Sequence, residues 1–92
     1  MELDFKAKET ISMQVRIIVM LSEICGLTQQ KVTEILSNTN ILQIIEKAYF
    51  MFHQEGDYAN MIHVRDALST QGYNIDIPPI NSKCWRVWNS LE

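Results

Sequence analysis

Apolar residues recur every three or four positions along most of the chain, the spacing of one face of an α-helix. This pattern predicts four helices, over residues 10–25, 29–37, 41–54 and 58–71. Residues 17–21 of the first helix are apolar nearly all round, which is typical of a central helix covered on several sides. Several of these residues are β-branched, so a strand is the main competing prediction at this point.

Glycines at the expected helix ends support this division. Gly26 and Gly72 follow the first and fourth helices, where glycine commonly adopts the left-handed conformation that closes a helix. Gly56 is expected to have a positive φ after the third helix. Asp57 is then expected to be the N-cap of the fourth helix.

Polar residues with capping chemistry precede two further helices. Thr28 is the expected N-cap of the second helix, because its hydroxyl can accept a hydrogen bond from an early helix amide. Asn40 with Gln43 three positions later resembles a capping box at the start of the third. The connecting loops are short, as expected for neighbouring antiparallel helices.

The character of the chain changes in its last twenty residues. Residues 73–77 alternate in polarity as in a strand, and Pro78 and Pro79 exclude a helix after them. Ser82 is expected to cap a short final helix over residues 83–91. The predicted fold is therefore all-α, a small four-helix domain with an extended C-terminal segment and a short amphipathic tail helix.

The chain is expected to form one domain over residues 1–92, with 1–9 as an N-terminal arm and 74–92 as a C-terminal extension. An apolar fraction of 47% and a charged fraction of 21% in 92 residues are typical of one folded domain. Its predicted core contains Val15, Ile18, Leu21, Ile35, Ile41, Ile45, Tyr49, Phe52, Ile62 and Leu68.

The net charge and the two cysteines limit the expected partners and location of the protein. A formal net charge of −3 argues against a surface that neutralises phosphates, so nucleic acid is not an expected partner. No signal-peptide pattern is present, and the longest apolar stretch, residues 17–21, is far shorter than the ~20 residues of a membrane span. A cytoplasmic location is expected, with Cys25 and Cys84 as reduced thiols or, alternatively, as one disulfide.

Several sequence features follow one another in a fixed order along the predicted helices. A short capped helix at residues 27–36 precedes a helix that starts at Ile41 and carries Tyr49. That helix ends in Phe52-His53-Gln54-Glu55-Gly56, and the last helix ends at Gly72. In these features, residues 11–73 resemble a family of small bacterial domains of unknown function, some encoded beside ADP-ribosyltransferase-like toxin domains. The resemblance implies an antitoxin or immunity role, and Tyr49, His53, Gly56 and Gly72 are its motif positions of unknown role.

The residues that most often carry chemistry do not form a recognisable motif. His53, His63, Cys25 and Cys84 have no ligand spacing, and no nucleophile elbow, P-loop, HExxH or dinucleotide motif is present. His53 is expected to stabilise the C-terminal end of the third helix, and His63 to lie on the surface. We therefore expect no enzyme activity, no catalytic or metal-ligating residues and no cofactor.

Two functions remain open. Residues 28–49 look like a helix-turn-helix, which makes a small DNA-binding regulator the alternative, although the second of these helices carries only one lysine, Lys47. The tail helix concentrates apolar area and either covers the core or docks on a protein partner or a second copy. Its candidate partner-binding residues are Trp85, Trp88 and Leu91. Non-enzymatic protein binding, with a protein partner or as a homodimer, is the expected function.

Overall fold

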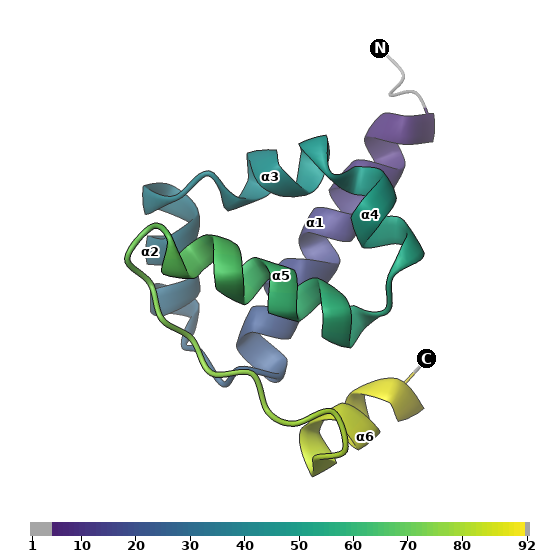
Figure 1. The fold of residues 1–92 in the computed structure, drawn as a ribbon, viewed down its shortest axis with the longest axis vertical. Coiled ribbons are helices and arrows are strands. Elements are labelled where there is room, and N and C mark those ends of the chain that lie inside the picture. Colours follow the sequence, from purple (N-terminus) through teal and green to yellow (C-terminus); the bar gives the residue numbers. More distant parts are fainter. Residues whose placement is uncertain (1–4, 92) are drawn as a thin grey trace.

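The computed structural model describes residues 5–91 of the chain, and this part is all-α, without a strand. It contains six helices (Figure 1): α1 Phe5–Glu23, α2 Gln29–Asn38, α3 Ile41–Lys47, α4 Tyr49–Gln54, α5 Asp57–Ser69 and α6 Lys83–Ser90. The all-α prediction is thus confirmed. Helix α1 begins at Phe5, so residues 5–9 of the expected N-terminal arm are helical, and residues 1–4 lie outside the described part.

Helix α1 is the centre of the fold. It packs against α2, α3, α4 and α5. In Figure 1, α3 and α6 lie on opposite sides of α5, and α6 is reached by a long irregular segment after α5. The buried cluster between these elements draws apolar side chains from all six helices and from the irregular segment.

The side of α1 that faces the core differs from the predicted one. The buried apolar residues of α1 are Ile17, Met20 and Leu21, whereas Val15, predicted in the core, is 52% exposed and Ile18 is only partly buried. Each residue turns a helix by about 100°, so the predicted stripe was rotated by roughly one position. The prediction was wrong because α1 is apolar on both sides, and periodicity alone does not choose between them.

Most of the remaining core prediction is confirmed. Seven predicted residues are buried: Leu21, Ile35, Ile41, Ile45, Tyr49, Phe52 and Leu68. Ile62, also predicted in the core, is only partly buried. Its neighbour Met61 is fully buried in its place. Ile75 and Trp85, both from the C-terminal extension, complete the core.

The predicted third helix is divided into two. Ala48 (φ −102°, ψ 26°) ends α3 and precedes α4. The backbone ladder nevertheless continues, because the Ala48 amide donates to Ile44 O at 2.9 Å and its carbonyl accepts from the Phe52 amide at 3.1 Å. The division is therefore a bend, and each piece keeps two apolar residues buried: Ile41 and Ile45 in α3, Tyr49 and Phe52 in α4.

The glycines behave in two ways. Gly26 (φ 69°) and Gly72 (φ 92°) have the left-handed conformation predicted for them. Gly56 does not, since its φ is −75° and it is itself the N-cap of α5, so that Asp57 is the first residue of the helix and not its cap. This shift frees the Asp57 carboxylate for contacts with other helices.

Of the other predicted helix caps, only the one at Thr28 makes the expected hydrogen bond. The Thr28 hydroxyl accepts from the Lys31 amide at 3.1 Å, as predicted. The capping box at Asn40 is absent, because the Asn40 amide donates to Gln71 Oε1 from the end of α5 (3.1 Å). Ser82 precedes α6 but makes no side-chain cap bond. Tertiary contacts thus replace local ones where α3 meets α5.

Residues 73–77 are irregular, so the predicted strand-like segment has no strand partner in the described chain. Its alternation still predicts burial, because Tyr73, Ile75 and Ile77 all pack against the core.

The two kinds of glycine give a test of backbone strain. Gly26→Ala should destabilise the protein by about 1–2 kcal/mol, because a Cβ is disfavoured at its positive φ although open space surrounds it. Gly56→Ser should be neutral or stabilising, because its φ is negative, space is open and serine is a good N-cap. Urea unfolding of both variants measures the difference, and equal losses would contradict the assignment.

Candidate functional site

One carboxylate connects three helices that are distant in the sequence. Asp57, the first residue of α5, accepts hydrogen bonds from Arg16 of α1 through Nε (2.8 Å) and Nη2 (2.6 Å). Its Oδ2 also accepts from Trp88 Nε1 of α6 at 2.8 Å. Bidentate pairing with arginine is among the strong, directional interactions available to a carboxylate. It positions α6 beside α1.

The electrostatics of this junction follow from its geometry. Burial alone raises the pKa of the Asp57 carboxyl, but the hydrogen bonds from Arg16 and Trp88 and the charge of Arg16 together lower it below its usual value. The hydrogen bond to Asp57 raises the pKa of Arg16. The Arg16 guanidinium also lies 5.4 Å from the centre of the Trp88 ring, a cation–π contact that ties α1 to α6 a second time.

Trp85 provides the other attachment of α6. Its side chain is 1% exposed, and its Nε1 donates to Pro78 O at 2.9 Å, so the indole is buried with its polar atom paired. Its ring meets that of Tyr58 edge to face, with 5.4 Å between centres. Of the three candidate partner-binding residues, Trp85 therefore lies in the core of its own chain.

The other two, Trp88 and Leu91, lie at a groove between α1 and α6. This groove has a volume of about 530 Å³, and most of its lining is apolar. The lining residues are Val19 and Glu23 from α1, Ile24 directly after it, and Lys83, Cys84, Val87, Trp88 and Leu91 from the C-terminal region. Leu91 is 76% exposed, so it remains available for contact with another molecule.

Exposed apolar residues lie along the two helices that border this groove. Seven large apolar side chains are exposed in the described part of the chain, and five of them belong to α1 or to α6 and its C-cap. We call these five residues the α1–α6 face: Ile11, Val15, Val19, Val87 and Leu91. Single exposed apolar residues are ordinary on protein surfaces, but a group of this kind is typical of an interaction site.

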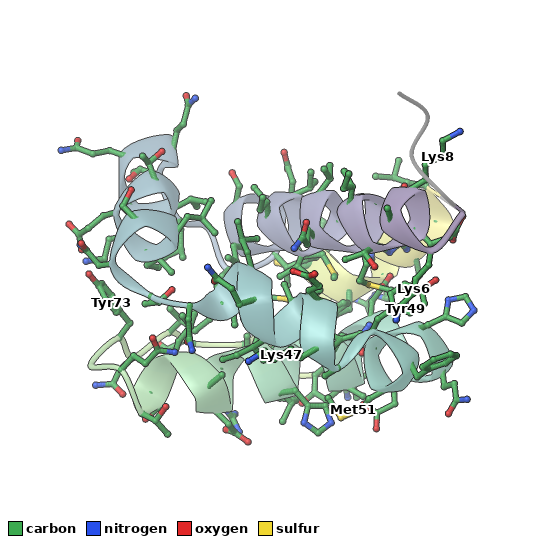
Figure 2. The ribbon with its side chains drawn as sticks, turned by 90° about the horizontal axis from the view of Figure 1, so that it is seen from above. Lys6, Lys8, Lys47, Tyr49, Met51 and Tyr73 are labelled. Carbon is green, nitrogen blue, oxygen red and sulfur yellow. The ribbon has the colours of Figure 1, made fainter. Side chains whose placement is uncertain are left out.

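The motif positions do not form a common site. Tyr49 projects from α4 towards α1 (Figure 2), and its ring stacks on that of His53, with 5.4 Å between centres and 3.5 Å from the hydroxyl to Nδ1. His53 is in the last turn of α4, where the helix dipole favours a cation. Gly56 and Gly72 lie near opposite ends of α5. His63 is on the surface as predicted and pairs with Glu55 at 2.9 Å.

The cysteines and acidic residues define no metal centre. Within residues 5–91, no group of three or more histidine, cysteine or acidic side chains is placed to hold a metal ion. Cys25 and Cys84 are both free thiols. Burial, and then the charge of Asp76, raise the pKa of Cys25 to about 11, so this thiol stays protonated at neutral pH and is a poor nucleophile.

The helix-turn-helix alternative depends on the exposed side of α3. Helix α3 buries Ile41 and Ile45 in the core. Its exposed residues are Gln43, Glu46 and Lys47, whose two charges cancel. A recognition helix requires groups that neutralise phosphates and read base edges, and α3 offers little of either. No helix in the described residues is long and apolar enough to cross a membrane.

The chain matches no family model, and searches of curated proteins and of solved structures found no match. The resemblance of residues 11–73 to small bacterial domains therefore stays an expectation from the motif positions.

Sequence reasoning did not find the junction at Asp57. The sequence predicts Asp57 only as a helix cap. The only available signal was that Arg16 and Trp88 each place a hydrogen-bond donor beside an apolar stripe. Such donors require an acceptor when they are half-buried, but the sequence does not name it.

Asp57→Asn should destabilise the protein by about 1–2 kcal/mol at neutral pH, a value reduced because Arg16 is 38% exposed. Because the folded pKa of Asp57 is lowered, its contribution is complete above the unfolded pKa of about 4 and is lost as the pH falls through the folded value. The difference between wild type and variant should therefore shrink below about pH 4.

Asp66→Asn is the matched control, because Asp66 is an exposed aspartate of the same helix that pairs only with its neighbour Arg65 in the described structure. Urea unfolding between pH 3 and 7 measures both variants. A constant difference between wild type and Asp57→Asn across this range would contradict the assignment.

Proposed function

We propose that the protein is a non-enzymatic binding module that buries its α1–α6 face against another polypeptide. The observation that carries this proposal is the concentration of five of the seven exposed large apolar side chains on these elements. The groove between them adds a concave, largely apolar surface. Apolar residues around a concave site are typical of surfaces that bind helices of partner proteins.

The energetics of this face suit a protein partner. Complete burial of one valine or leucine side chain contributes about 1.5–3 kcal/mol relative to exposure. Five half-exposed residues therefore offer about 4–8 kcal/mol, before the cost of association. A micromolar complex needs about 8 kcal/mol net, so a partner at this face has to add contacts of its own.

The groove favours an amphipathic helix as the bound element. Val19 of α1 and Trp88 of α6 bring apolar surface from both helices, while Glu23 and Lys83 add one charge of each sign. A helix with an apolar stripe and charges on its flanks would complement both features. The tail then has two roles, with Trp85 stabilising the core and Leu91 contacting the partner.

The resemblance of residues 11–73 supports a more specific role, as an antitoxin or immunity-like partner of a toxin-like enzyme encoded nearby. The free thiols Cys25 and Cys84 are compatible with a reducing, cytoplasmic location, which we include in the proposal. For the fold, we regard α3 and α4 as one bent helix of a four-helix domain, to which the extension adds α6.

Co-expression with the product of the neighbouring gene tests this role. Wild-type protein should co-elute with that product in gel filtration and reduce its enzymatic activity. Val19→Asp should abolish both effects, because it places a charge in the apolar face. Phe50→Asp is the control, since Phe50 is exposed on α4 outside the face. A wild-type protein that neither co-elutes nor alters activity contradicts the role, and equal effects of both variants contradict the location.

A further inference from the structure

The side of α1 that points away from the core has the composition of a helix–helix contact. Ile11, Val15 and Val19 follow one another at four-residue spacing, and all three are exposed. The small residues Ser12 and Ser22 are exposed beside them. Such a stripe permits close approach of a second helix, because neither long nor charged side chains stand along its middle.

The charges at the two ends of this stripe are opposite. Lys8 lies seven residues before Val15, and Glu23 lies eight residues after it, and both side chains are exposed. At a rise of about 1.5 Å per residue, the two charges are about 22 Å apart along α1. The stripe is therefore basic at one end, apolar in the middle and acidic at the other end.

We propose that a second copy of the chain covers this stripe, with the two α1 helices antiparallel about a two-fold axis near Val15. In such an isologous contact, each residue meets its counterpart on the other side of the axis. Val15 then meets Val15 of the second copy, Ile11 meets its Val19, and Lys8 meets its Glu23. The inference rests on the proposed function, because it uses part of the same α1–α6 face and names its occupant.

The direction of pairing follows from the charges. Parallel helices would place Lys8 against Lys8 and Glu23 against Glu23, which costs free energy at both ends. Antiparallel helices convert both contacts into attractions. The charge order of α1 therefore favours the two-fold arrangement.

The groove gains an occupant in this arrangement. Ile11 of the second copy lies beside Val19. Val19 lines the groove together with Val87 and Leu91. The two-fold axis repeats this contact, so each copy fills part of the groove of the other. This interface consists of one side of α1 and the edge of α6. It is expected to bury less surface than the ~800 Å² per partner of a standard interface. Dimerisation should therefore be reversible and depend on protein concentration.

Charge reversal on the full chain tests the pairing. Light scattering during gel filtration, in low salt and over a concentration series, should show wild-type dimers. Lys8→Glu and Glu23→Lys should each weaken dimerisation on the order of tenfold, because each creates two like-charged pairs. An equal mixture of the two variants should recover dimers that contain one copy of each, because both of its pairs are attractive. The double variant should also dimerise.

Each result decides the inference. A wild-type monomer at hundreds of micromolar overturns it, as does a dimer that neither reversal weakens or a mixture of variants that does not recover dimers. Circular dichroism should show unchanged helix content, since both side chains are exposed, so loss of the dimer is not loss of the fold. A monomer that still neutralises the neighbouring enzyme overturns only the self-pairing. A dimer that does not bind that enzyme overturns only the antitoxin role.

Discussion

Asp57 is the first residue of α5, and its carboxylate accepts hydrogen bonds from both α1 and α6. Burying a charge is costly unless it is paired, and here the bidentate contact with Arg16 and the indole N–H of Trp88 provide that pairing. The junction therefore decides where α6 lies. With Trp85 inserted in the core, it converts a C-terminal extension into one wall of a groove. The α6 part of the α1–α6 face lies beside α1 only while this attachment holds.

Helix α1 is apolar on two opposite sides. One side packs against four other helices and forms much of the core, and the opposite side exposes Ile11, Val15 and Val19. A central helix that only stabilised its own fold would be polar on the outside. The proposed binding function accounts for the second apolar side, and the opposite charges of Lys8 and Glu23 account for its direction in a symmetric pair.

Features governed by local chemistry could be predicted from the sequence. The helix of residues 29–37, the Thr28 cap and the left-handed glycines at 26 and 72 depend on neighbouring residues, and all are present. Features governed by tertiary contacts could not. The core side of α1 was misplaced because both sides are apolar, and the Asn40 amide donates to Gln71, which lies just after α5. The junction at Asp57 joins positions up to 41 residues apart, for which a single sequence gives no signal.

Asp57 holds α6 in place and thereby completes the α1–α6 face, the proposed binding surface. Amide hydrogen exchange of wild type and Asp57→Asn at neutral pH measures this directly, residue by residue. We expect the amides of α6 to lose protection in the variant while those of α1, α3 and α5 keep most of theirs. Unchanged protection of α6 would contradict the claim and would assign the attachment of the tail to Trp85 alone.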